Sequence, residues 1–403
     1  MDVLVITSLL LVGYLIFTLD THKENVPVPV LLVLIGIGLS FIPVYRDISL
    51  TGELMYDVFL PALLFLSAYQ FPFQDFKRLS VWIISQATIG LFITVFALGG
   101  VIYILGSLFF DLPFLVALLI AAILTPTDPV SVISILKQSA DDAELAEMVE
   151  GESLVNDGTS IVIFTVIAGM VAGNQGYSFA SVTFNFLFVI LFGVLLGLVF
   201  GWLLQWAVHL THDRHYQVML SIIVAYGSFH LAELAGASGV IAVVTAGILL
   251  SRTFERSAVE RHFRESLDGF WTIIEVTLVS FLFLVIGIVS AELLLDTSWL
   301  LAFLILISYL VIRWVTVYGL SNVFPFSRPR VSPANAAILS VAGLKGVVSV
   351  VLILTLEFDP IGETVMVAAI SFTVVLLSVV LQSLLIHPLT KKLSGNPDKQ
   401  DLM

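Results

Sequence analysis

The stretch that decides the fold is residues 112–136, which read LPFLVALLIAAILTPTDPVSVISIL. It is long and apolar enough to cross a bilayer, but it cannot be one continuous helix. Pro126 and Pro129 each remove a helical hydrogen bond, and Asp128 stands between them. A charge at mid-membrane depth is costly, so charged residues occur there mainly where they have a function. We therefore expect a membrane-spanning helix that is interrupted around Asp128.

The rest of the chain is equally apolar. Of its 403 residues, 59% are hydrophobic and 12% are charged, whereas soluble domains carry about 25% charged residues. This composition predicts an all-α membrane protein. The absence of cysteine excludes disulfides and thiolate metal sites, and a net charge of −13 argues against a nucleic-acid partner. The N-terminus has no basic region and is interpreted as a first span, not a cleaved signal peptide.

Apolar runs of transmembrane length number about thirteen. They cover residues 2–19, 26–44, 53–71, 80–108, 112–136, 146–173, 178–208, 216–234, 237–251, 268–291, 297–322, 331–355 and 361–388. With the N-terminus outside, 14 of the 17 Lys and Arg residues fall in inside segments, Arg46 falls outside, and Arg313 and Lys345 fall within spans. This asymmetry follows the positive-inside rule and supports both the count and an N-out, C-in orientation.

An odd number of spans allows two halves that cross the membrane in opposite directions. We expect a single transmembrane domain over 1–403, with half one at about 1–173, a linker helix at about 178–208 and half two at about 216–388. Inverted repeats of this kind are typical of secondary transporters. The remaining residues, 389–403, are expected to form a short cytoplasmic tail, which favours a prokaryotic protein of the cell membrane.

The corresponding span of the second half, residues 331–355, is interrupted as well. It contains VAGLKGVVSV, in which Lys345 lies between Gly343 and Gly346. Paired discontinuous helices are the best sequence indication of a transport site. Asp128 can meet the positive N-terminal end of a half-helix, and Lys345 can meet negative C-terminal ends. The alternative is a pair of kinked packing helices with snorkelling charges.

A helix rich in carboxylates follows the first interruption. Residues 146–170 read AEMVEGESLVNDGTSIVIFTVIAGM. Glu152 and Asn156 are four residues apart, and so are Ser153 and Asp157, so two adjacent stripes are expected to form one polar face. The alternative is a polar network that only ties helices together.

Hard cations prefer oxygen ligands, and the two segments together supply them. The candidate ligands of a monovalent cation are Thr127, Asp128, Ser153 and Asp157, helped by carbonyls freed at Pro126 and Pro129. A carboxylate removed from water is stabilised by either a proton or a cation and is costly with neither. Competition between the two predicts exchange of a cation for a proton.

Two more charges lie within spans, Glu275 and Arg313. An unpaired Arg at this depth would be prohibitive, so Arg313 must face a carboxylate. Glu152 is the first expected partner and Glu275 the second. We interpret the pair as structural, holding the central helices together.

The segments TPTDPVSV (125–132) and GESLVNDGTSIVIF (151–164) resemble cation:proton antiporters of the NhaP and eukaryotic NHE type, and the resemblance runs along nearly the whole chain. It implies a thirteen-helix, NhaA-like fold, a homodimer, and a transporter that is not an enzyme and needs no cofactor. The residues that it implies for the ion site are the Thr127 backbone, Asp128, Ser153 and Asp157. It also implies that Glu152 pairs with Arg313.

Two positions depart from that family pattern. Lys345 stands where Arg is usual, and Leu66, in LLFLSAYQ, stands where an acidic residue is usual. Both leave the preference among Na⁺, Li⁺ and K⁺ open. Asn156 stands before Asp157, where electrogenic relatives of the NhaA type carry a second Asp.

The expected function is therefore secondary antiport of Na⁺ (or Li⁺ or K⁺) against H⁺, electroneutral and 1:1. A K⁺/H⁺ antiporter and a cation channel are the alternatives. A channel would not need matched interruptions in two opposed halves, and a membrane hydrolase would need a water-activating motif that is not visible. His209, His212 and His215 repeat every three residues, which fits either a helical metal or pH-sensing face or a solvated loop.

Overall fold

The computed structural model describes residues 3–20, 28–46, 52–109, 112–128, 132–133, 136, 143–173, 179–208, 213–256, 258–294, 297–323, 329–356 and 363–393. Every element it assigns in these ranges is helical, which confirms the predicted all-α fold class. Three residues that the sequence singles out, Pro129, His209 and His212, lie outside the described residues.

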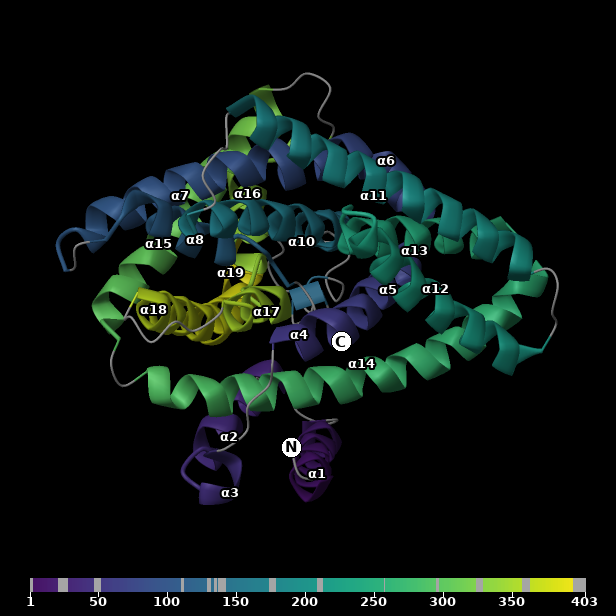
Figure 1. Cartoon of the computed structure of the whole chain (residues 1–403), viewed down its shortest axis with the longest axis horizontal. Coiled ribbons are helices and arrows are strands. Elements are labelled where there is room, and N and C mark those ends of the chain that lie inside the picture. The colour runs from purple at the N-terminus through teal and green to yellow at the C-terminus, as the bar shows by residue number, and fades with distance from the viewer. Residues whose placement is uncertain are drawn as a thin grey trace, which may run out of the picture.

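Figure 1 labels the α-helices along the chain. Short segments of wider, π-type turns between them are written η. In chain order the helices are α1 (Val3–Asp20), α2 (Val28–Leu39), α3 (Pro43–Arg46), α4 (Gly52–Leu54), η1 (Met55–Phe59), α5 (Leu60–Gln70), α6 (Phe73–Ser85), η2 (Gln86–Gly90), α7 (Leu91–Gly106), α8 (Phe114–Ile123), α10 (Ala143–Val171), α11 (Phe179–Val208), α12 (Arg214–Leu234), α13 (Gly239–Arg256), α14 (Ala258–Leu293), α15 (Trp299–Val323), α16 (Pro333–Ala342), α17 (Val347–Leu354), α18 (Glu363–Leu377), η4 (Ser378–Gln382) and α19 (Ser383–Leu393).

The lengths of these helices suit a multi-pass membrane protein. Within the described ranges, eight helical stretches are long and apolar enough to cross a membrane, and α16 with α17 forms a further candidate bent by 47°. Four shorter apolar helices have 10–17 residues each. Each of the ranges predicted from the sequence as a span overlaps one of these stretches, although the bounds differ by several residues, as in Phe73–Gly106 against the predicted 80–108.

The two interrupted helices begin and end for local reasons. α8 begins after Pro113, whose backbone is extended, and it ends ahead of Pro126, through which a helix cannot continue unbroken. α16 begins at Pro333, where the Ser332 side chain accepts a hydrogen bond from a backbone N–H of the first turn. It ends before Gly343.

The long helix α14 divides the molecule as drawn in Figure 1, with α1 and α2 on one side of it and α5, α17 and α18 on the other. α2 and α14 approach closely because Gly36 lies against the backbone of Leu284 and Gly287 lies against the backbone of Val33. A Cβ at either glycine would overlap the facing backbone. Small residues allow this kind of close helix packing in membranes.

The helix α10 occupies the middle of the molecule (Figure 1). It packs against α8 and also contacts α5, α13, α16 and α17. Its polar residues are therefore placed next to both interrupted helices, and this position determines where a site can form.

Candidate ion site

The two interruptions meet each other. Residues 125–128 after α8 and residues 343–346 between α16 and α17 are not helical. The backbone N–H of Asp128 donates a hydrogen bond to the carbonyl oxygen of Leu344, with 2.8 Å between N and O. The two non-helical segments thus satisfy one another's backbone groups, which neither helix can do alone.

Each interruption places its charge at an end of the other broken helix. The Asp128 Oδ2 atom lies 3.5 Å from the backbone N of Val347, the first residue of α17, and accepts its hydrogen bond. The Lys345 Nζ atom lies 3.5 Å from the carbonyl oxygen of Pro126, just beyond the C-terminal end of α8. Negative charge at a helix N-terminus and positive charge at a C-terminus are both stabilised by the helix dipole. This is the arrangement expected from the sequence.

Two glycines make the close approach possible. A Cβ at Gly346 would overlap the side chain of Asp128, and a Cβ at Gly343 would lie 2.8–2.9 Å from the guanidinium group of Arg313. Any other residue at either position would push a charged group out of place. The glycines on both sides of Lys345 are therefore required by neighbours from other helices.

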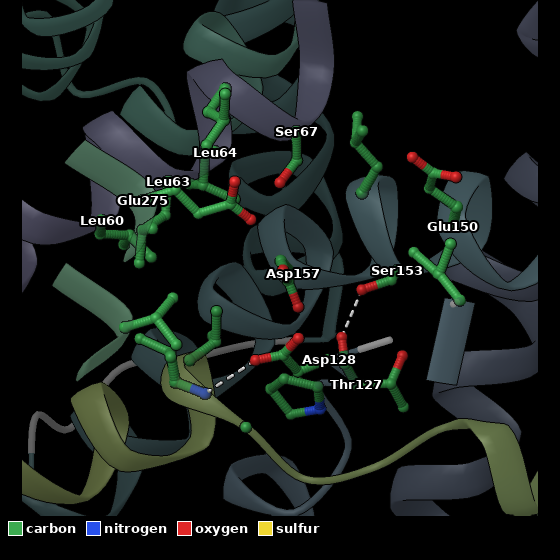
Figure 2. A pocket seen from close by; sticks show the side chains of 18 of the residues that line it. Leu60, Leu63, Leu64, Ser67, Thr127, Asp128, Glu150, Ser153, Asp157 and Glu275 are labelled. Atoms are coloured by element: carbon green, nitrogen blue, oxygen red, sulfur yellow. Dashed lines mark hydrogen bonds between the residues drawn. The ribbon is translucent and has the colours of Figure 1, made fainter. Parts of the chain in front are cut away.

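A cavity of about 420 Å³ opens beside the first interruption. Thr127, Asp128, Ser153 and Asp157 line it together. Figure 2 shows the Asp157 side chain pointing toward Asp128, with Ser153 donating its hydrogen bond to the Thr127 carbonyl oxygen. The structure thus gathers four of the five residues expected to take part in transport around one space.

One oxygen in this group stands out. The Oδ1 atom of Asp157 is buried and has no hydrogen-bond partner among the described residues. A carboxylate oxygen in that position is costly unless a proton, a cation or water occupies the space in front of it. The carboxyl pair of Asp128 and Asp157 can therefore bind either a proton or a small cation.

The fifth residue, Asn156, does not line the cavity. Its Nδ2 atom lies 3.4 Å from the Thr125 carbonyl oxygen and 3.3 Å from Thr127 Oγ1, and its Oδ1 accepts a hydrogen bond from Ser160. Asn156 thus supports the non-helical segment after α8 from the side.

The expectation of one polar face on α10 is corrected accordingly. Ser153 and Asp157 face the cavity, whereas Glu152 and Asn156 face the side where Arg313 lies. Successive helical residues point about 100° apart, so two adjacent stripes can face different neighbours. Tertiary packing separates them into an ion-facing stripe and a supporting stripe.

The buried Arg313 is paired with Glu152. Its two terminal nitrogens donate hydrogen bonds to the two carboxylate oxygens, at 3.0 Å and 2.8 Å. Both side chains are almost fully buried. Glu275, the second partner considered, lines the cavity instead. The pair links α10 to α15 with two charge-assisted bonds and leaves no net charge.

Three supporting residues were not singled out from the sequence. Tyr309, on α15, places its ring 3.3 Å from the Lys345 Nζ atom. Ser378 accepts a hydrogen bond from the Lys345 backbone N–H, and Gln382 donates to the Val341 carbonyl oxygen at 2.9 Å. The spacing of four between Tyr309 and Arg313, and between Ser378 and Gln382, was an available signal that these residues share a helix face.

Three further residues line the cavity beside the candidate ligands. Glu150 and Glu275 line the cavity on opposite sides in Figure 2, and Leu66, one of the two departures from the family pattern, lines it from α5. A carboxylate among apolar residues of a span is a signal for such a position, and Glu275 carries this signal, although the sequence favours it as a second possible partner of Arg313.

Of the three histidines that repeat every three residues, the structure describes His215. His209 and His212 lie outside the described residues. Asp213, just before α12, has an extended backbone. His215 is exposed and binds Asp213 through its backbone N–H and its ring. The backbone hydrogen bond is the main cause that holds the pKa of Asp213 below its usual range. Among the described residues there is no group of three His, Cys, Asp or Glu side chains suited to a metal.

Known proteins with similar sequences and the same fold identify the family of this chain. The chain is 30% identical to the Na(+)/H(+) antiporter ApNhaP of Aphanothece halophytica over 93% of its own length and 71% of that protein. It is 33% identical to the Na(+)/H(+) antiporter NhaP of Pseudomonas aeruginosa over 86% of its length and 82% of that protein.

A solved structure has the same fold. The sodium proton antiporter MjNhaP1 from Methanocaldococcus jannaschii, determined at pH 8, superposes with a TM-score of 0.79. The match covers 97% of this chain and 98% of that one at 19% sequence identity. Residues 6–392 match the family described as "Sodium/hydrogen exchanger, transmembrane". This chain therefore belongs to the sodium/hydrogen exchanger family.

Proposed function

We propose that this protein is an Na⁺/H⁺ antiporter in which Na⁺ and H⁺ compete for Asp128 and Asp157. The observation that carries the proposal is the buried Oδ1 of Asp157, which has no hydrogen-bond partner among the described residues and faces the cavity that Asp128 also lines. When a proton leaves, the carboxylate remains stable only if a cation takes its place. Loading of one ion therefore requires release of the other.

The proposed ligands of the cation are oxygen atoms of four residues. They are the Thr127 carbonyl, the Ser153 hydroxyl and the carboxylates of Asp128 and Asp157, which surround the same space. In the arrangement described here the Ser153 hydroxyl donates to the Thr127 carbonyl oxygen. This contact holds two ligands together before the cation arrives. Asn156 is assigned a supporting role outside the ligand set, because it binds Thr125 and Thr127 from the other side.

The charges around the site favour electroneutral 1:1 exchange. Glu152 and Arg313 cancel one another in their pair. Lys345 lies at the end of α8, where its fixed positive charge can balance that of Asp128. Asp157 then remains as the group whose charge is neutralised by one proton or one cation in turn. The pairing of these charges supports the 1:1 stoichiometry, together with the uncharged Asn156 beside Asp157.

The location, oligomeric state, orientation and internal repeats of the protein are also proposals. We assign the protein to a prokaryotic cell membrane as a homodimer, with the N-terminus outside and the C-terminus in the cytoplasm. Half one (1–173) and half two (216–388) are proposed as inverted repeats around the linker (178–208). Their support is that each half braces its interruption with a side-chain amide, Asn156 in the first and Gln382 in the second.

The test is cation-dependent dissipation of a pH gradient in proteoliposomes, compared among Na⁺, Li⁺ and K⁺. Exchange driven by Na⁺ supports the proposal, exchange driven by K⁺ alone identifies a K⁺/H⁺ antiporter, and cation current without proton counterflow identifies a channel. Asp157→Asn should abolish exchange, while the matched control Asp57→Asn removes an exposed carboxylate outside the cavity and should not. Normal exchange by purified Asp157→Asn would refute the site.

A further inference from the structure

We infer that Glu275 on α14 belongs to the cation pathway, where its carboxylate draws the cation into the cavity and raises the affinity of the Asp128 and Asp157 site for it. The inference rests on the proposed function, because it concerns the same cavity. It assigns a role to a residue that the pairing of Arg313 with Glu152 leaves without a structural task.

The position of Glu275 is the first argument. It lines the same cavity as Asp128 and Asp157, but from α14. Figure 2 shows its carboxylate reaching into the cavity beside Leu63 and Leu64, across from Asp157. Two walls of one cavity thus present carboxylates to the space between them.

The surroundings of Glu275 are the second argument. The neighbouring part of the cavity wall is mostly apolar, formed by Leu60, Leu63, Leu64 and Val279, with Ser67 as a polar residue on the same side. No described residue forms a hydrogen bond or an ion pair with Glu275. A carboxylate in such a wall is costly, so whatever stabilises it must enter the cavity.

Another carboxylate on the same helix provides the contrast. Asp268 accepts a hydrogen bond from the Tyr69 hydroxyl at 2.9 Å and lies 3.8 Å from Arg264. Asp268 therefore has a structural role in joining α14 to α5. Glu275 is two helical turns further along α14 and has no such partner, although it lies where the helix borders the cavity.

The charge of the cavity is the third argument. Its described lining includes four carboxylates and no Lys or Arg side chain, since Lys345 and Arg313 lie outside it. In a low-dielectric site, each additional negative charge raises the local cation concentration. The effect of Glu275 should thus appear in the affinity for the cation more than in the rate of turnover.

The test compares Glu275→Gln with wild type and with Glu265→Gln, which removes the same charge from an exposed position on the same helix. In proteoliposomes, Glu275→Gln should raise KM for Na⁺ by about fivefold or more and change kcat by less than about twofold. Glu265→Gln should change neither. A readout without turnover is the Na⁺-induced rise in Tm of the purified protein in detergent, which should need a correspondingly higher Na⁺ concentration in Glu275→Gln.

A rescue separates pathway charge from local packing. Leu66 lines the same cavity from α5, so Glu275→Gln combined with Leu66→Glu returns a carboxylate to the cavity from a different helix. Recovery of KM in this double variant supports the inference. An unchanged KM in Glu275→Gln, or a loss of kcat alone, overturns it.

Folding failure is covered by a conservative variant. If Glu275→Gln does not fold, Glu275→Asp moves the carboxylate back by one methylene. A KM for Na⁺ raised about twofold in this variant supports the inference. A KM and an Na⁺-induced rise in Tm equal to those of wild type overturn it. The two proposals fail differently. Absence of exchange in the wild type refutes the proposed function, whereas normal exchange with a wild-type KM in Glu275→Gln refutes only the role of Glu275.

Discussion

The two interrupted helices are braced in the same way, each by a side-chain amide from the helix that follows it. In the first half the Asn156 amide donates to the Thr125 carbonyl oxygen, and its own oxygen accepts from Ser160. In the second half the Gln382 amide donates to the Val341 carbonyl oxygen, and its own oxygen accepts from Ser378. Both amides satisfy backbone groups that an unbroken helix would have paired.

The two interruptions differ in what they present to the cavity. Asp128 lines it beside a second carboxylate, whereas Lys345 is fully buried, lies over the ring of Tyr309 and does not line it. The same backbone device thus serves two purposes. The first interruption exposes a group that can exchange its ion, and the second holds a charge fixed against it.

The largest effect is expected at the charge that faces the cavity. Asp128→Asn should reduce exchange by about a hundredfold or more, because losing a charge partner in a water-excluded site costs about 3 kcal/mol. The measurement is Na⁺-driven proton flux in proteoliposomes containing equal amounts of folded protein. Exchange within a few-fold of wild type would mean that the first interruption is structural as well.

The buried pair of Arg313 and Glu152 is expected to have the next largest effect. Arg313→Ala leaves Glu152 buried without a partner and should lower the free energy of unfolding by about 3–5 kcal/mol. Arg78→Ala is the control, since Arg78 is half exposed in its pair with Glu147 and should cost about 1 kcal/mol or less. Thermal unfolding in detergent makes the comparison. Equal Tm values for Arg313→Ala and wild type would contradict a stabilising pair.

The two amide braces should have similar, smaller effects. Asn156→Leu and Gln382→Leu each leave buried carbonyl oxygens unpaired, which should cost about 1–3 kcal/mol of stability. Asn322→Leu is the control, because Asn322 is exposed and one of its two acceptors, the Tyr318 carbonyl oxygen, belongs to an exposed residue. If only one of the two variants loses stability, the parallel between the interruptions does not extend to their energetics.

Exchange should largely survive a conservative change at the fixed charge. Lys345→Arg keeps the positive charge and can stack on Tyr309, so exchange should stay within about tenfold of wild type. Initial rates across a range of Na⁺ concentrations measure this. Complete inactivity of folded Lys345→Arg would show that the amine itself takes part in the cycle, and the division between the two interruptions would fail.

The smallest expected effect is that of the membrane potential, which should be zero. A cycle that moved one net charge would feel about 2.3 kcal/mol per 100 mV, which biases exchange nearly fiftyfold. An electroneutral cycle feels none. The measurement is the equilibrium pH gradient under a Na⁺ gradient, with the potential clamped by K⁺ and valinomycin. A pH gradient that follows the clamped potential would contradict 1:1 exchange.

Much of this protein is determined by its sequence alone. The apolar composition selects helices in a membrane, because a helix makes all of its backbone hydrogen bonds within its own segment and needs none from water. Pro126 and the Gly343–Gly346 segment determine where two helices break, since proline and glycine act on their own backbone. The spacing in GESLVND places Ser153 with Asp157 on one stripe and Glu152 with Asn156 on another.

Only the tertiary structure decided which stripe faces the cavity, which carboxylate pairs with Arg313, and which one is left in the cavity wall. Glu152 and Glu275 are both carboxylates within apolar helices, and the sequence offered each as a partner. Because α15 lies beside α10, Arg313 pairs with Glu152. The position of α14 leaves Glu275 facing the cavity. Helical periodicity fixes directions relative to one helix axis only. The rotation of each helix against its neighbours is set by packing between residues far apart in the chain.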